Sequence, residues 1–162
     1  PLVRAAERIA SVEDRAVFHG YDAAGIQGIL PAAVHEPIGY GGPKSFPSVV
    51  VGAKEILRKA GIARPYALVL GPTLYDELHS AAEDGFPIYD RIAPMVDAIV
   101  WCPALTDAVL LSTRGGDFEL TVGQDLSIGY AGSDRESVEL FLVSSFTFRV
   151  LTPQAAVGVR RG

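Results

Sequence analysis

Cysteine is nearly absent from this chain, which limits the chemistry that the chain can carry. Its one cysteine, Cys102, has no second cysteine with which to form an internal disulfide. This usage indicates a reducing compartment such as the cytoplasm. Because Cys102 lies between Trp101 and Pro103 at the end of an expected strand, a buried small apolar side chain is a better interpretation than a reactive thiolate.

Long hydrophobic runs are also missing from the sequence. Its apolar stretches are all far shorter than the roughly 20 residues that a membrane-crossing helix needs, and no signal peptide is visible. We therefore expect no membrane partner. The chain begins at Pro1 without a methionine, and we expect it to be a fragment or a protein whose upstream part is absent from this sequence.

Positive charge is scarce as well. The chain has 14 Lys and Arg against 19 Asp and Glu, a net charge of −5. A nucleic-acid binder needs clustered Lys and Arg to neutralise phosphates, so we expect no nucleic-acid partner. The three histidines, His19, His35 and His79, lack the spacing of metal-binding motifs, so we expect no metal site and no cofactor.

Hydrophobic residues, in contrast, make up 49% of the 162 residues. The length fits one domain, or one domain with a small appendage. A chain this apolar must either pack very well or cover part of its surface against partners. The composition therefore weakly favours a protein that assembles.

The spacing of the apolar residues predicts the elements. Helices are expected at residues 1–19, from a cap at Ser45 or Ser48 to Ala60, around Leu74 and Leu78, and from the turn at residues 83–87 to about Pro94. Residues 31–47 are rich in proline and glycine and predict a loop. Strands are expected at residues 66–70, 98–102, 108–112 and 137–151, with a short strand at 155–159.

The strand at residues 137–151 alternates with period two and is expected to bury one face. Helices dominate the first part of the chain and strands the last, without regular βαβ alternation, which indicates the α+β class.

Residues 111–130 indicate a strand, a tight turn and a second strand. Gly115 and Gly116 can adopt the positive φ that a two-residue hairpin turn requires. Arg114 would face Asp117 across the mouth of this hairpin. We therefore interpret Arg114, Gly115, Gly116 and Asp117 as a structural turn.

One partial signal for nucleophilic catalysis follows this turn. The segment Asp125–Gly129 keeps the second half of a GxSxG elbow around Ser127, but has Asp where the first Gly belongs. The segment Gly132–Asp134 follows where the elbow needs a helix. A loop between strands is the favoured interpretation, and a serine-type hydrolase that uses Ser127 is one alternative. A peptide-binding domain that does not assemble is another.

An acidic cluster gathers at one expected helix end and the turn after it. Its members are Asp76, Glu77, His79, Glu83 and Asp84. In a monomer this cluster is a solvated tip. In a symmetric ring, five or six copies would line a hole and set its charge.

Five segments, in order along the chain, share one resemblance. They are residues 12–29 (Glu13-Asp14, Phe18, Gly20 and Gly25-Ile-Gln-Gly-Ile29), 65–75 (Pro-Tyr-Ala-Leu-Val-Leu70 and Leu74-Tyr75), 85–87 (Gly-Phe-Pro), 111–130 (Arg-Gly-Gly-Asp-Phe118 and Gly-Gln-Asp-Leu-Ser-Ile-Gly-Tyr130) and 144–153 (Ser-Ser-Phe-Thr-Phe148, Val150 and Pro153). Together they resemble the encapsulin shell proteins, the linocin or bacteriocin-type family, in its C-terminal portion.

The resemblance implies part of the tailed-phage major-capsid fold (Hong Kong 97 type). Residues 1–30 and 105–162 would form a peripheral domain with a long helix and a sheet, and residues 31–104 an axial domain. Family members are structural proteins that self-assemble into icosahedral cages in the cytoplasm. They enclose a cargo enzyme, a peroxidase or a ferritin-like protein, by binding a short C-terminal peptide of that cargo. Their N-terminal region is longer and helps to form the cargo groove, and none of it precedes Pro1.

The resemblance also assigns positions. His79, Glu83, Asp84, Gly85 and Phe86 match the pore loop at the five-fold axis. Asp125, Leu126, Ser127 and Ile128 match positions near the interior cargo-peptide groove. There Leu126 and Ile128, with Asp125 on the rim, could capture an apolar peptide that carries a basic residue. The alternative that Leu126 and Ile128 are core and that Asp125 caps a turn stays open.

Overall fold

The structure is a computed structural model that describes residues 2–162. Its helices are α1 (Leu2–His19), α2 (Ile29–Ala32), α3 (Phe46–Lys59), α4 (Pro72–Ser80) and α5 (Ile88–Ile92), with 3-10 turns η1 (Asp22–Ala24), η2 (Pro43–Ser45), η3 (Ala93–Met95) and η4 (Pro153–Ala155). Its strands are β1 (Ile38–Tyr40), β2 (Tyr66–Leu70), β3 (Ala82–Glu83), β4 (Phe86–Pro87), β5 (Ala98–Trp101), β6 (Ala108–Ser112), β7 (Phe118–Ser133), β8 (Val138–Val150) and β9 (Ala156–Arg161).

A five-stranded sheet forms the body, in the order β1-β9-β6-β2-β5. β2 runs parallel to β5 and antiparallel to β6, while β9 runs antiparallel to β6 and parallel to β1. Every residue of β2 and β6 is buried, which is why both strands are continuous apolar runs in the sequence. Within residues 2–162, no helix is both long and apolar enough to cross a membrane.

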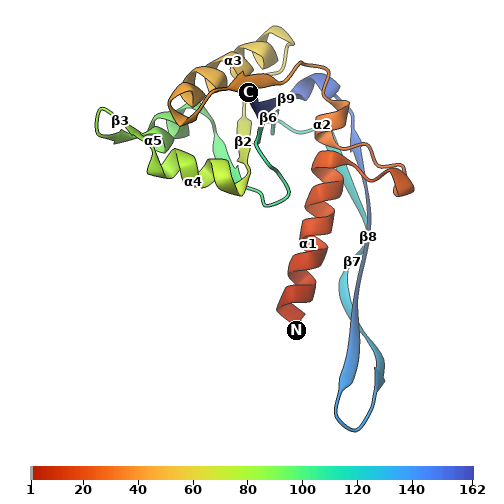
Figure 1. Ribbon diagram of the computed structural model, residues 1–162. Helices are drawn as coiled ribbons and strands as arrows, with labels where there is room; N and C mark the ends of the chain where they lie inside the picture. The colour runs from red at the N-terminus through yellow and green to blue at the C-terminus, as the bar shows by residue number, and fades with distance from the viewer. Residues whose placement is uncertain (1) are drawn as a thin grey trace.

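Both faces of this sheet are covered. Helices α3, α4 and α5 contribute Phe46, Leu57, Leu74, Leu78 and Ile88 to the core on one face. On the other face, the segment around α2 and the base of β8 contribute Ile26, Ile29 and Phe148. The body is therefore a layered α+β unit, from which α1 and the β7–β8 hairpin extend on the same side (Figure 1).

The predicted loop at residues 31–47 contains a strand that the sequence did not reveal. β1 pairs with β9 at the edge of the sheet, and its Tyr40 is buried. The predicted cap of α3 is correct in position at Ser45, but its side chain makes no capping hydrogen bond. Ser45 stands at the N-cap but donates its hydroxyl hydrogen bond to Gly42 O at 2.8 Å, and Ser48 lies inside the helix.

The predicted hairpin across residues 111–130 is wrong. β6 already pairs with β2 and β9 on its two sides, so it has no free edge for β7. β7 pairs instead with β8 in a long antiparallel hairpin. Its turn is stabilised by the Asp134 carboxylate, which accepts the backbone N–H of Glu136 at 2.8 Å and that of Ser137 at 2.7 Å.

Period two in β8 predicts one buried face, and the half of the strand nearer the body has one: Phe148 is buried and Leu142, Ser144, Phe146 and Val150 are half-buried, while residues 143, 145, 147 and 149 are exposed. Toward the hairpin turn, Val138 and Leu140 on the same face are exposed. The hairpin extends beyond the end of α1 (Figure 1), so no second layer covers its outer half.

The sheet joins strands from both predicted domains. β1, β2 and β5 lie in residues 31–104, whereas β6 and β9 come from residues 105–162. The division into peripheral and axial domains stays a prediction, and the strand order of the sheet shows no boundary between the two. Only the hairpin and α1 stand apart from the body (Figure 1).

A substitution at Gly28 tests the close backbone packing against the C-terminal end of α1. A Cβ at Gly28 would lie 2.3 Å from Gly20 N and 2.6 Å from His19 C, and backbone atoms cannot move aside as flexible side chains do. We expect Gly28→Ala to reduce the free energy of unfolding by about 3 kcal/mol or more. Urea unfolding measures this loss. Gly39→Ala is the control, because its Cβ meets nothing within 4 Å, and an equal loss there would contradict the prediction.

Candidate functional sites

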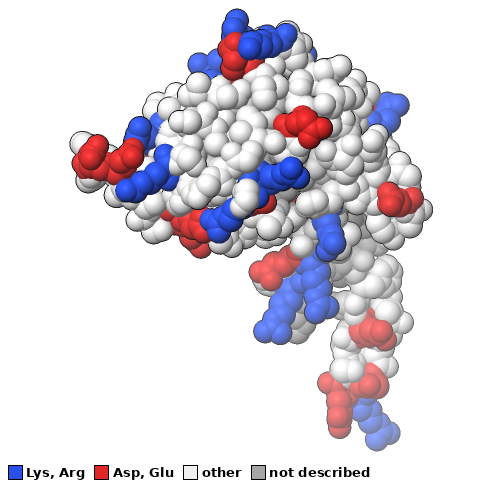
Figure 2. Space-filling view, turned by 45° about the horizontal axis from the view of Figure 1, so that its top comes forward, with Lys and Arg blue, Asp and Glu red and all other residues white. Residues whose placement is uncertain are grey.

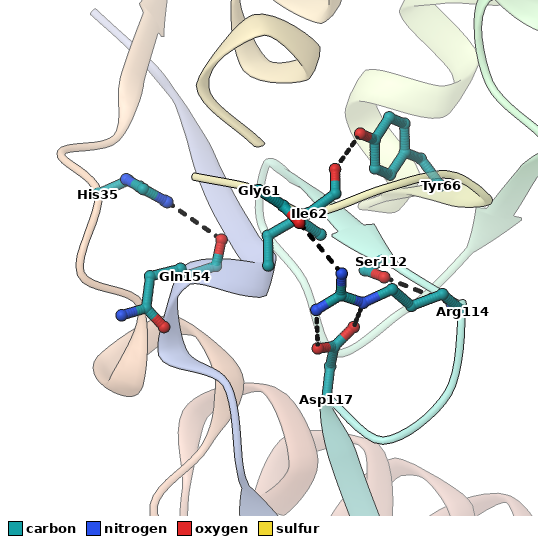
Figure 3. Close-up of polar contacts among 8 residues, drawn as sticks. All are labelled: His35, Gly61, Ile62, Tyr66, Ser112, Arg114, Asp117 and Gln154. Atoms are coloured by element: carbon teal, nitrogen blue, oxygen red, sulfur yellow. Dashed lines mark hydrogen bonds and ion pairs between the residues drawn. The ribbon is translucent and has the colours of Figure 1, made fainter. Parts of the chain in front are cut away.

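The Arg114–Asp117 turn joins the hairpin to the body. Arg114 Nε lies 3.0 Å from Asp117 Oδ2, and Arg114 Nη2 lies 2.9 Å from Asp117 Oδ1, which makes a two-pronged ion pair. Arg114 Nη1 also donates to Gly61 O at 3.3 Å, in the loop after α3 (Figure 3). One guanidinium therefore ties the start of β7 to a loop of the body.

Asp117 fastens the other strand of the hairpin. Its backbone carbonyl accepts the N–H of Leu151 at 2.8 Å and that of Thr152 at 3.1 Å, where β8 returns to the body. The side chain is only 3% exposed. Burial by itself raises the pKa of Asp117, but hydrogen bonds from Arg114, Ser112 and Thr152 outweigh it and hold the pKa below its ordinary value. The carboxylate is therefore charged, buried and fully partnered.

The sequence predicted part of this geometry. Gly115 and Gly116 have φ values of 88° and 80°, the positive values expected of them, and the Arg114–Asp117 pair forms. The turn connects two sheets and does not close a two-residue hairpin.

The residues predicted for the cargo groove lie on β7, near a β-bulge. Gln124 pairs with Ser145 and Ser127 with Val143, so β7 has one extra residue in this interval. The bulge lets the neighbouring residues Asp125 and Leu126 both line a groove between the hairpin and α1.

This groove has a volume of about 250 Å³. The hairpin supplies its apolar wall and α1 closes it from the other side, as the two elements run together from the body in Figure 1. The lining residues are Glu13, Asp14 and Val17 from α1 and Leu120, Val122, Gln124, Asp125, Leu126, Ser144, Ser145 and Phe146 from the hairpin.

Ile128 does not line this groove. Its side chain is 61% exposed and that of Leu126 is 50% exposed, so neither residue is core among the described residues. The sequence did not indicate the two α1 residues Glu13 and Asp14 as members of this site. Their adjacent carboxylates, three and four residues before Val17 on an amphipathic helix, were the available signal.

Ser127 lacks the setting of a nucleophile. It lies inside β7, and Gln124 Nε2 donates to its hydroxyl at 2.9 Å. An elbow needs a sharp turn from a strand into a helix, and β7 continues to Ser133. The structure therefore contradicts the hydrolase alternative.

Each histidine hydrogen-bonds to a backbone carbonyl, and the one cysteine is buried. The hydrogen-bond acceptors of His19, His35 and His79 are the backbone carbonyls of Ala104, Gln154 and Tyr75, at 2.8, 3.1 and 2.9 Å. Burial raises the pKa of the Cys102 thiol. Among residues 2–162, no group of three or more His, Cys, Asp or Glu side chains could hold a metal ion.

Four of the predicted pore residues, Glu83 to Phe86, form a small hairpin at the edge of the body, while His79 lies on α4. Asp84 and Gly85 have φ values of 51° and 81°, which close the turn between β3 and β4. Phe86 is 67% exposed beside it. Acidic and basic side chains gather together at this left-hand end of the body (Figure 2).

The acidic cluster is less negative than its sequence suggests. Glu83 pairs with Arg91, and Glu77 pairs with Arg161 at the end of β9. The His79 ring stacks on Tyr89 with the ring centroids 3.8 Å apart. Asp76 and Asp84 are the two acidic members of the cluster without an ion-pair partner among the described residues.

Comparisons with known proteins identify the family. A family model described as encapsulating protein for peroxidase matches residues 1–147. The type 1 encapsulin shell protein of Rhodospirillum rubrum is 45% identical over 163 residues, which cover 99% of this chain. That of Mycobacterium tuberculosis is 38% identical over 161 residues, which cover 98% of this chain. The chain belongs to the encapsulin shell protein family.

The chain spans about three fifths of the length of these encapsulin relatives, 58% of the R. rubrum protein and 61% of the M. tuberculosis protein. Solved structures agree on the fold. A virus-like particle from Pyrococcus furiosus matches with a TM-score of 0.68 at 18% identity, over 93% of this chain and 63% of that chain. A Mycobacterium phage Che8 structure matches with a TM-score of 0.57 at 14% identity, over 78% of this chain and 52% of that chain. The predicted capsid-like α+β fold is confirmed.

The buried pair gives a prediction for stability. We expect Asp117→Asn to lower the free energy of unfolding by about 1.5–3 kcal/mol, the usual loss for hydrogen bonds to a charged group. Chemical unfolding at neutral pH measures it. Asp97→Asn is the matched control, since Asp97 also accepts a two-pronged pair, from Arg64, at a far more exposed site. An equal or larger loss in the control would contradict the prediction.

The same pair predicts a pH dependence. The folded-state pKa of Asp117 is below its ordinary value, which is about 3.9 in an unfolded chain. Its contribution to stability is therefore present above that pH and is lost as the pH falls through the lower folded-state pKa. We expect the difference in stability between wild type and Asp117→Asn to shrink below about pH 4. A difference that stays constant down to pH 2 would contradict this assignment.

Proposed function

We propose that the chain is part of a structural shell subunit that assembles into a closed icosahedral cage in the cytoplasm and encloses a cargo enzyme. Membership of the encapsulin family along nearly the whole chain carries this proposal. The capsid-like fold supports it. The cargo would be a peroxidase or a ferritin-like protein, held through its C-terminal peptide, and the shell subunit itself would not be an enzyme.

The exposed surface of the hairpin also supports assembly. Outside residues 125–128, large apolar side chains with at least 37% exposure line both of its strands: Leu120, Val122, Tyr130, Val138, Leu140, Phe141 and Val143. A monomeric protein rarely exposes so many neighbouring apolar side chains. Contact with other parts of a shell would remove this surface from water.

The proposed cargo site is the stretch Asp125–Ile128 on β7. Its apolar side chains are exposed and sit beside a groove, as a binder of short peptides requires. The proposed pore loop is the hairpin of Glu83, Asp84, Gly85 and Phe86, with His79 behind it. In a ring of copies, its exposed Asp84 and Phe86 would set the charge and apolar character of a hole.

Particle size tests the cage. We expect the full-length gene product to form closed, uniform particles in negative-stain images, because the relatives of matching sequence are shell proteins. Size-exclusion chromatography should place the protein in the void fraction of a standard column. Small soluble species alone would contradict the proposal.

Ile128 tests the cargo site. We expect Ile128→Asp to lower the amount of co-purifying cargo enzyme about tenfold while particles still form, because a charge replaces an exposed apolar contact. The control is Val34→Asp, which changes a side chain of similar exposure, 60% against 61%, away from the hairpin. Unchanged cargo, or loss of particles, would contradict the role of Ile128 in cargo binding.

A further inference from the structure

The groove between α1 and the hairpin carries charge of one sign only. Its charged lining residues are Glu13, Asp14 and Asp125, and no Lys, Arg or His of the described residues lines it. Between these carboxylates lie apolar side chains, among them Val17, Leu126 and Phe146. A ligand that fits must therefore offer apolar groups and a positive charge.

One of the two α1 carboxylates, that of Glu13, is held toward the hairpin by a hydrogen bond. Ser144 on β8 donates its hydroxyl hydrogen bond to Glu13 Oε1 at 2.8 Å. Glu13 and Asp14 are both half-buried, and no ion pair within residues 2–162 includes either of them. Burial raises the pKa of Asp14, and the neighbouring charge of Glu13 raises it further. Two adjacent, partly desolvated anions without a counter-ion favour a cation beside them.

The next groove along α1 shows that this charge pattern is local. It shares Ser144, Ser145 and Phe146 with the acidic groove but is lined by Arg15 and Asp22, so its charges are mixed. Successive residues of a helix point about 100° apart. α1 therefore presents Glu13 and Asp14 to one groove and Arg15 to the other.

We propose that Glu13 and Asp14 of α1, together with Asp125 of β7, form a subsite for a Lys or Arg side chain of the cargo peptide. The apolar neighbours of that cation would rest on Val17, Leu126 and Phe146. This inference rests on the proposed cargo-enclosing function and adds to it the helix residues that select a positively charged peptide. Such a side chain would form charge-assisted hydrogen bonds with the carboxylates and relieve their mutual repulsion.

A peptide-binding measurement tests the subsite. The probe is a fluorescein-labelled C-terminal peptide of the enzyme that co-purifies with wild-type shells, together with a copy in which Gln replaces each Lys and Arg. Fluorescence anisotropy measures the binding of both peptides to assembled shells. We expect wild-type shells to bind the basic peptide about tenfold more tightly than the Gln copy, and the preference to weaken as salt is added.

The double variant Glu13→Gln and Asp14→Asn should remove this preference while the Gln copy binds as before. Both changes conserve size, so particle formation and the thermal midpoint should be unchanged. Glu7→Gln is the matched control on the same helix, because Glu7 is exposed and does not line the groove. It should keep the wild-type preference.

The outcomes separate the two proposals. If the double variant keeps the full preference for the basic peptide, or if wild-type shells bind both peptides equally, the subsite is wrong while cargo capture on β7 stands. If no enzyme co-purifies with wild-type shells, the cargo-enclosing function itself is contradicted. A reversed preference in Asp14→Lys, for a peptide with Glu in place of its basic residues, would support the subsite independently.

Discussion

The placement of the hairpin depends on one buried carboxylate. Asp117 receives both prongs of Arg114, and its backbone carbonyl receives two N–H groups from the far end of the hairpin. The same arginine reaches Gly61 in the body. Without these contacts the two long strands would meet the body only through apolar packing around Phe148. Apolar packing is not directional, so it holds the hairpin close to the body more firmly than it fixes the angle between them. A directional, charge-assisted pair is the kind of contact that sets an angle, and a subunit of a closed shell needs its arms at a fixed angle.

The hairpin itself has the composition of an interface. Its apolar side chains alternate along β8 as they would in a sheet with one covered face, and this face is half-buried near the body but exposed at Val138 and Leu140 toward the turn. Across the hairpin, the Phe141 ring lies over Gly129 and occupies the place of a side chain there. At Val138 and Leu140 the sequence therefore continues the pattern of a buried face where residues 2–162 leave it exposed. The proposed assembly into a shell would cover these outer side chains without any change in the fold.

The bounds of several helices and strands were predictable from the sequence, and the pairing of the strands was not. The bounds of β2 and β6 agree with their apolar runs, and α1 ends before Gly20. Both were predictable because a run of buried residues and a helix-ending glycine are signals carried by neighbouring residues in the sequence. The β6–β7 hairpin failed because the edge of β6 is taken by β9, a strand more than forty positions later. β1 was missed because a three-residue edge strand between Pro37 and Pro43 has no periodicity to detect. Two of the predicted cargo-groove residues, Asp125 and Leu126, line the groove. The residues of α1 that line it could not be predicted, because they come next to β7 only in the folded chain.

The helix wall changes how the groove can discriminate between ligands. Apolar side chains on β7 alone would accept many short peptides, because apolar contact is weakly selective. Carboxylates fixed on a helix add a cost for peptides that lack a cation, since two neighbouring anions then stay desolvated and unpaired. The hydrogen bond from Ser144 to Glu13 lets β8 orient this helix wall. Arg114 and Asp117 hold the hairpin to the body, so the joint that would place this arm in the proposed shell also places one wall of the groove.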